Sequence, residues 1–164
     1  MRLCSIASGS SGNCVYVGSD TTHLLMDVGI SGKRTEAGLA ELGLTMKDID
    51  AICITHEHAD HISGLGVLSR KYGVPVYATR GTLEAIRQMS SLGRIDDSLF
   101  RVVTPDERCI IKDISLYPVR TSHDAADPVA YRIDHDGRRI GILTDLGCYT
   151  DYTVECLRNL DLLY

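Results

Sequence analysis

The 164-residue sequence has no Trp and only one Phe, and aromatic residues make up 5% of it. Proteins that bind single-stranded nucleic acid without sequence preference stack successive bases on aromatic side chains. The scarcity of aromatic residues therefore argues against binding of that kind.

The sequence also lacks long hydrophobic runs and paired cysteines. No apolar run approaches the roughly 18 residues that a membrane-spanning helix needs, so we expect no membrane association. The six cysteines include no Cys-x-x-Cys pair, and their spacing indicates no disulfide framework. A reducing, cytoplasmic setting is therefore expected.

Strong positive charge is absent as well, since the formal net charge is −5. This mildly acidic balance argues against a surface that coats nucleic acid broadly. Bound cations would nevertheless add positive charge locally, so a nucleic-acid substrate stays possible. There is no repeat, low-complexity segment or linker, and we expect residues 1–164 to form one domain.

The hydrophobic pattern predicts a layered α/β fold, with helices on the outer faces of mixed strands. Residues 100–119 are expected to form a three-stranded meander, and Asp136-Gly137 a hairpin turn. Strands are predicted at 3–7, 14–17, 23–28, 51–55, 74–78, 100–103, 108–112, 114–119, 129–133 and 139–144, and helices at 33–42, 62–72, 83–89 and 152–159.

The last residues, Leu160 to Tyr164, have the pattern of a strand that enters a core. Chain ends are more often polar and exposed. We therefore expect the chain to lack the C-terminal portion of its domain.

Four metal-binding side chains lie within the segment His56-Glu57-His58-Ala59-Asp60-His61, directly after the apolar run 51–55. Side chains two residues apart in extended backbone point the same way, so His56 and His58 can converge on one cation. Asp60 and His61 can then face a second cation nearby. The segment predicts a site for two divalent metal ions at the end of a strand.

This motif resembles the signature of the metallo-β-lactamase superfamily. The resemblance implies an αββα sandwich and a metal-dependent hydrolase with two divalent ions, Zn²⁺ or Mn²⁺. It implies that His123 completes the first site, that Asp145 bridges the two ions, and that Asp27 supports the ligand loop without binding metal. The implied metal ligands are His56, His58, Asp60, His61, His123 and Asp145.

Alternatives remain open for several of these positions. Asp27 could form a turn, and Asp145 could cap a helix or form a turn. His135 is expected to be a turn residue and His23 a strand residue without a metal role. In the family a final His binds the second ion, and it would follow Tyr164 here, so the second site is the less complete one.

Further segments narrow the resemblance to the YycJ/WalJ branch of the superfamily. They are residues 7–13, 29–33, 61–68 and 122–128, which extend through nearly the whole chain. The resemblance implies DNA 5′→3′ exonuclease activity, with hydrolysis by a metal-activated hydroxide. Asp60 or Asp145 would hold the nucleophile or shuttle its proton.

The Ser/Gly segment offers backbone N–H groups and the side chains of Ser10, Ser11 and Asn13 as possible phosphate contacts. It could equally be a plain tight turn. Lys33 and Arg34 are expected near the mouth of the site, whereas the pairs 70–71 and 138–139 are expected to be solvated surface charges.

Two other functions compete with the nuclease. A small-molecule hydrolase on the same fold, acting on a cyclic phosphodiester, ester or lactone, is favoured by the acidic net charge. A metal-binding fragment without catalysis is favoured by the missing final ligand.

Overall fold

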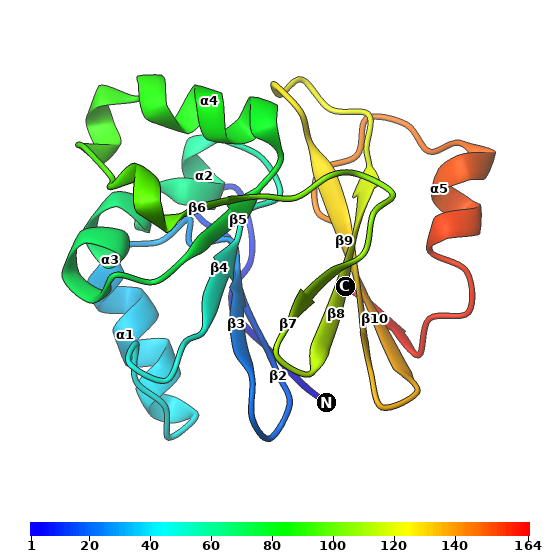
Figure 1. The fold of residues 1–164 in the computed structure, drawn as a ribbon, viewed down its shortest axis with the longest axis horizontal. Coiled ribbons are helices and arrows are strands. Elements are labelled where there is room, and N and C mark those ends of the chain that lie inside the picture. The colour runs from blue at the N-terminus through cyan, green and yellow to red at the C-terminus, as the bar shows by residue number, and fades with distance from the viewer.

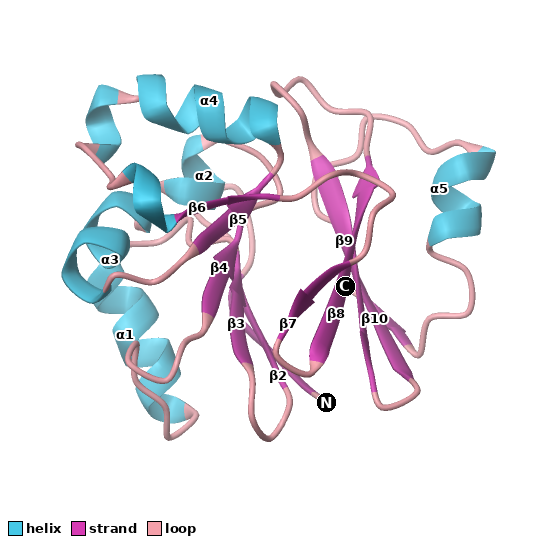
Figure 2. Cartoon of the chain, viewed as in Figure 1, coloured by secondary structure: helices cyan, strands magenta, loops and turns pink.

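Two β-sheets pack face to face in this computed structural model, which describes residues 1–164 (Figure 1). Helices α1 (Gly32–Glu41), α3 (Leu65–Tyr72) and α4 (Arg80–Gln88) cover the outer face of the first sheet, and α5 (Asp151–Cys156) lies outside the second (Figure 2). The order of layers is helices, sheet, sheet, helix. The expected αββα sandwich is confirmed.

The first sheet has the order β1-β2-β3-β4-β5-β6, with antiparallel pairs up to β3 and parallel pairs from β3 to β6. The second has the order β11-β10-β9-β8-β7. The strands are Arg2–Ala7, Cys14–Gly18, His23–Met26, Ala51–Cys53, Val76–Ala78, Phe100–Val102, Cys109–Ile111, Ile114–Arg120, Val129–His135, Arg138–Ile142 and Leu162–Leu163, for β1 to β11 in turn. The helices are α1 Gly32–Glu41, α2 Ala59–Ile62, α3 Leu65–Tyr72, α4 Arg80–Gln88 and α5 Asp151–Cys156, with 3-10 turns at Ser90–Leu92 and Asp97–Leu99.

The central strands of the first sheet are apolar on both faces because each face meets another layer. Leu25 and Ile52 belong to the core beneath the helices. Their neighbours Leu24, Met26 and Cys53 belong to the core between the two sheets. This double burial explains the continuous apolar run before the His/Asp segment.

Three expectations about the elements were wrong. Strand β6 does not join a meander: it pairs in parallel with β5 in the first sheet, while β7 pairs with β8 in the second. The predicted helix 62–72 is divided into α2 and α3 at Ser63 and Gly64. A Cβ on Gly64 would lie 2.3 Å from the carbonyl oxygen of Ile30, so the chain passes too closely there for any side chain.

The third concerns the C-terminal strand: β11 itself does not enter a core, although Tyr164 after it packs against the core between the sheets. Strand β11 pairs in parallel with β10 at the edge of the second sheet. Leu162 and Leu163 are 42% and 57% exposed. The predicted hairpin at Asp136-Gly137 is confirmed, and both residues have the positive φ that such a turn requires.

The candidate residues follow strand ends at one edge of the sandwich. Asp27 follows β3 and His56 follows β4, and these two strands run parallel. His123 follows β8 and Asp145 follows β10 in the second sheet. Val129 N–H donates to the carbonyl of Thr55, which ties the two sheets together at this edge.

Candidate metal centre

The short helix α2 and the residue before it carry three of the candidate metal ligands. His58 precedes its first residue with extended backbone angles, and Asp60 and His61 lie within it. The backbone of the helix is anchored from outside: Asn13 N–H donates to the carbonyl of Asp60, and Val28 N–H donates to that of His61. The local chain is therefore held by the residue before β2 and by the loop after β3.

Three imidazole rings meet at the first candidate site. The ring centroids of His56 and His58 lie 4.6 Å apart, those of His56 and His123 4.6 Å, and those of His58 and His123 4.8 Å. One ring nitrogen of each residue lies within 4.8 Å of the others. Tetrahedral zinc sites use such sets of three histidines.

Hydrogen bonds fix which nitrogens of His58 and His123 face inward. Nε2 of His58 lies 3.1 Å from the carbonyl oxygen of Asp124, which can only accept, so Nε2 carries the proton. Nδ1 of His123 lies 3.1 Å from the carboxylate of Asp124 and is protonated for the same reason. In the neutral rings the remaining nitrogens, 3.2 Å apart, then face each other with lone pairs. Two opposed lone pairs repel, and a shared cation removes that repulsion.

His56 provides the most direct sign that the site suits a metal ion. Its side chain is buried, and its Nε2 atom has no hydrogen-bond partner. Burial, together with the neighbouring histidines, lowers the pKa of His56 to about 3. The ring is therefore neutral at pH 7, which is the form that binds metals.

A second group shares His56 and adds His61 and Asp145. Nε2 of His61 lies 3.0 Å from a carboxylate oxygen of Asp145 and 3.5 Å from Oδ2 of Asp60. Burial alone would lower the pKa of His61, but the hydrogen bond and charge of Asp27, with Asp60 and Asp145, raise it overall. Asp60 falls outside both three-residue groups.

Asp27 lies beneath both groups and is almost completely buried. Its backbone has φ of +58°, a conformation that Asp tolerates better than most residues. One carboxylate oxygen accepts from Nδ1 of His61 at 2.8 Å, and the other accepts from the backbone N–H of Thr55 at 2.8 Å. These contacts are compatible with the supporting position that the resemblance implied.

Three polar residues at the site have roles that the sequence alone does not reveal. The side-chain amide of Asn13 lies 3.1 Å from Nε2 of His61 and 3.3 Å from Oδ2 of Asp60, although it was expected to face phosphate. Glu57 is 8% exposed and accepts a 2.7 Å hydrogen bond from the backbone N–H of Ala126. Thr55 bonds to Asp27 and His56. For Thr55, the only signal in the sequence was that a polar residue ends the apolar run 51–55.

The remaining candidate residues belong to neither of the two groups of metal-binding atoms. Nδ1 of His23 bonds to the hydroxyl of Tyr16, and Nδ1 of His135 bonds to the carbonyl of Asp113. Ser10 and Ser11 are exposed in the turn after β1, and Lys33 and Arg34 are exposed in the first turn of α1.

The basic pairs lie on the surface, as expected: Arg70, Lys71 and Arg138 are exposed and Arg139 is half-buried. They also form hydrogen bonds or ion pairs there. The Arg70 guanidinium donates to the carbonyl of Leu92, and Lys71 pairs with Glu36. Arg138 pairs with Asp161, and Arg139 lies 3.9 Å from Asp134.

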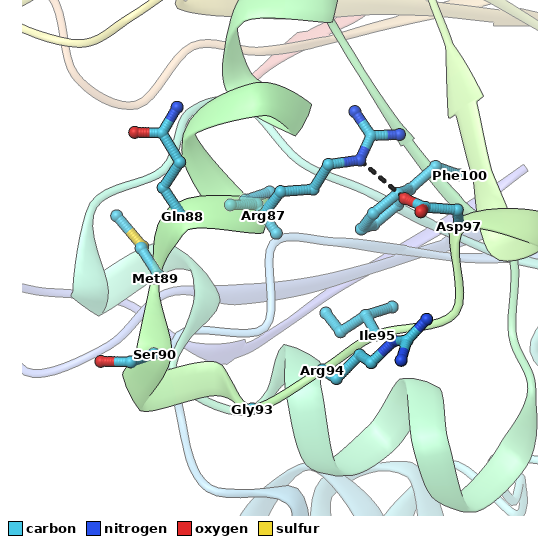
Figure 3. Close-up of a pocket in the computed structure, with 10 residues that line it drawn as sticks. Arg87, Gln88, Met89, Ser90, Gly93, Arg94, Ile95, Asp97 and Phe100 are labelled. Atoms are coloured by element: carbon cyan, nitrogen blue, oxygen red, sulfur yellow. Dashed lines mark hydrogen bonds and ion pairs between the residues drawn. The ribbon is translucent and has the colours of Figure 1, made fainter.

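A pocket of about 550 Å³ opens between the end of α4 and β6 (Figure 3). Arg87 forms an ion pair there with Asp97 and stacks over Phe100. None of the candidate ligands lines it. The pocket and the histidine cluster are therefore separate features.

Comparison with known proteins agrees with this geometry. A family model described as beta-lactamase superfamily domain matches residues 22–164. An exodeoxyribonuclease WalJ of Streptococcus pneumoniae is 40% identical over 156 residues, which are 95% of this chain and 58% of that protein. An exodeoxyribonuclease YycJ of Bacillus anthracis is 41% identical, over 89% of this chain and 54% of that protein. The chain thus spans a little over half the length of these relatives.

Solved structures show the same fold at low identity. The metallo-β-lactamase-fold protein YhfI of Bacillus subtilis superposes with a TM-score of 0.76 at 21% identity, over 98% of this chain and 68% of that one. Zn²⁺-bound PqqB of Methylobacterium extorquens gives 0.75 at 16% identity, over 92% and 58%. Family match, sequence identity and fold together establish that the chain belongs to the metallo-β-lactamase-fold superfamily, in the branch that contains WalJ and YycJ.

Proposed function

We propose that this protein is a divalent-metal-dependent hydrolase of DNA phosphodiesters, acting as a 5′→3′ exonuclease. The observation that carries the proposal is the placement of His56 in two adjacent clusters of metal-binding atoms. The substrate class is supported by the similarity to exodeoxyribonucleases, which extends over 95% of the chain.

The residues present suit two divalent ions, Zn²⁺ or Mn²⁺. His56, His58 and His123 would hold the first, and His61, Asp145 and Asp60 the second. Bound ions of this kind lower the pKa of water to near 7 and stabilise negative charge on a phosphoryl oxygen.

Asp145 and Asp60 are the residues that would handle protons. Their side chains are 38% and 31% exposed, so both can meet water and substrate. Asp145 approaches His61 through one carboxylate oxygen, and Asp60 is held by the amide of Asn13. Either carboxylate can orient a water molecule and accept its proton. Ser10 and Ser11, exposed nearby in sequence to Asn13, remain our candidates for contact with substrate phosphate.

The test is hydrolysis of duplex DNA labelled at one end, with Mn²⁺ or Zn²⁺ added to the metal-free protein. We expect metal-dependent release of nucleotides that the substitution His123→Ala abolishes. His135→Ala is the matched control, since His135 bonds to Asp113 far from the cluster, and it should leave hydrolysis unchanged. Metal-independent cleavage, or equal loss in both variants, would contradict the proposal.

A small-molecule hydrolase is the second candidate, favoured by the net charge of −5, which repels DNA. Turnover of a cyclic phosphodiester, ester or lactone without cleavage of DNA would select it. A metal-binding fragment without catalysis is the third, because the second group holds only three protein ligands. One tight metal site and no turnover of any substrate would select that one.

None of the α-helices has the length and apolarity that crossing a bilayer demands. We propose a cytoplasmic location, supported by the six cysteines, all of which are free thiols, as is usual in a reducing compartment.

A further inference from the structure

The hydroxyl group of Thr55 lies between a buried carboxylate and two candidate metal ligands. Oγ1 of Thr55 is 2.8 Å from Oδ2 of Asp27, 3.0 Å from Nδ1 of His56 and 3.4 Å from Nδ1 of His61. The residue is 1% exposed, so water cannot substitute for any of these contacts.

The directions of these hydrogen bonds follow from the number of hydrogens. The Asp27 carboxylate can only accept, so the single hydroxyl hydrogen of Thr55 points to Asp27. The Thr55 oxygen is then available to His56 only as an acceptor. Nδ1 of His56 must therefore carry a proton, and its Nε2 keeps a lone pair.

The same carboxylate acts directly on the other ligand. Oδ2 of Asp27 accepts from Nδ1 of His61 at 2.8 Å, so Nε2 of His61 also keeps its lone pair when the ring is neutral. Nε2 of His56 is buried without any partner, and Nε2 of His61 faces Asp145. The Asp27 carboxylate thus fixes both rings: it bonds directly to His61 and reaches His56 through the hydroxyl of Thr55.

We propose that Thr55 is a positioning residue, which relays the acceptor charge of Asp27 to His56 and holds that ring in the tautomer that can bind metal. The proposal rests on the proposed role of His56 as a ligand. This role belongs to the side-chain hydroxyl of Thr55 alone, because the backbone N–H of Thr55 bonds separately to the other carboxylate oxygen, Oδ1 of Asp27.

The substitution Thr55→Val isolates the hydroxyl, since it keeps the branched shape and the backbone hydrogen bond. Thr55→Ser restores the hydroxyl on a smaller side chain. Thr35→Val is the matched control: Thr35 is equally buried and lies on α1, and its hydroxyl bonds to the carbonyl of Ser31 and to the thiol of Cys14 but to none of the histidines.

The first measurement is the tautomer of each ring in the metal-free protein at pH 8, read from ¹H–¹⁵N multiple-bond spectra. We expect the Nδ1–H form of His56 in the native protein, in Thr55→Ser and in Thr35→Val. Thr55→Val should lose that preference at His56 and keep it at His61, which contacts Asp27 directly. An Nε2–H tautomer of His56 in the native protein would overturn the proposal without any variant.

The second measurement is Zn²⁺ affinity by competition with a chelator. Loss of a partner behind a metal-bound histidine typically costs about 10–100-fold, so we expect that loss in Thr55→Val and recovery in Thr55→Ser. Unchanged affinity in Thr55→Val would overturn the relay. Unchanged affinity in His56→Ala would instead overturn the proposed metal site, and the tautomer result separates these two failures.

Discussion

Nδ1 of His58 and Nε2 of His123 lie 3.2 Å apart, although 65 residues separate them in the chain. One follows a strand of the first sheet and the other a strand of the second. Asp124 holds both rings by hydrogen bonds on their outer nitrogens. The two sheets therefore have to pack correctly before the first candidate site exists.

Removing either ring should weaken metal binding more than removing a supporting residue does. We expect His58→Ala to lower Zn²⁺ affinity by more than the roughly 10–100-fold that supporting partners contribute. Chelator competition measures this. The control is His23→Ala, because His23 bonds to Tyr16 at the start of β3. Equal effects of the two substitutions would place the metal elsewhere.

Metal binding should stabilise the folded protein because the ligands come from loops that only folding brings together. At a free metal concentration about 100 times Kd, the expected gain is roughly 2.7 kcal/mol in the free energy of unfolding. Thermal melting with Zn²⁺ and then with excess chelator measures it. The gain should disappear in His56→Ala, and a gain that persisted there would contradict the assignment.

Glu57 is expected to fasten the loop that carries His123. Its carboxylate accepts from the backbone N–H of Ala126, three residues after His123. Glu57→Ala leaves a backbone donor without its partner and should cost about 1–3 kcal/mol, whereas Glu57→Gln keeps an acceptor and should cost less. Urea unfolding gives the free energies. Faster hydrogen exchange at Ala126 in Glu57→Ala alone locates the effect, and equal exchange in both variants would refute it.

Gly29 leaves room for the backbone of α2. A Cβ at this position would lie 1.6 Å from the carbonyl oxygen of Asp60, so Gly29→Ala must displace the ligand helix. We expect a loss of at least about 1–3 kcal/mol together with weaker metal binding. Gly32→Ala is the control, since its Cβ would meet its nearest neighbour at 3.4 Å, an ordinary contact. Native-like metal affinity in Gly29→Ala would contradict this prediction, because it would show that displacing α2 does not weaken metal binding.

Asp113 should make stability depend on pH at the edge opposite the metal centre. It lies in the turn between β7 and β8 and bonds to Thr22 and Ser19 in the turn between β2 and β3. These hydroxyls, Thr22 above all, lower the pKa of Asp113 to about 2. Because the pKa of Asp113 is lower in the folded state, its ionised carboxylate stabilises the protein at pH values above the unfolded-state pKa of about 3.9. This stabilisation is lost as the pH falls toward 2.

Comparison of the native protein with Asp113→Asn tests this effect. The difference in melting temperature should be present at pH 6 and should shrink toward zero near pH 2, where the carboxyl group is neutral. A difference that stayed constant across this range would mean that the charge of Asp113 contributes nothing.

The positions of the candidate ligands could be predicted because each follows a recognisable apolar strand. The run Ala51–Ile54 identifies β4, and His56 must then lie at the edge of a sheet. His123 and Asp145 were expected from the resemblance to the superfamily, and they too follow strands, β8 and β10. Strand ends are local features, so sequence alone can locate them.

The supporting contacts could not be predicted because they join distant parts of the chain. Thr55 meets Asp27 across 28 positions, Asn13 meets Asp60 across 47, and Glu57 meets Ala126 across 69. The sequence around each of these residues does not indicate which distant residue it contacts. The meander expected for residues 100–119 was wrong for the same reason. The pattern of β6 indicates a strand, but not that it pairs with β5 and contacts α4 in the first sheet.

The most direct test of the central claim is anomalous X-ray diffraction from crystals of the protein grown with Zn²⁺. We expect one peak among Nε2 of His56, Nδ1 of His58 and Nε2 of His123, and a weaker one beside His61 and Asp145. The claim that these five side chains form a metal centre would be contradicted by metal peaks at other positions only, with none beside the five.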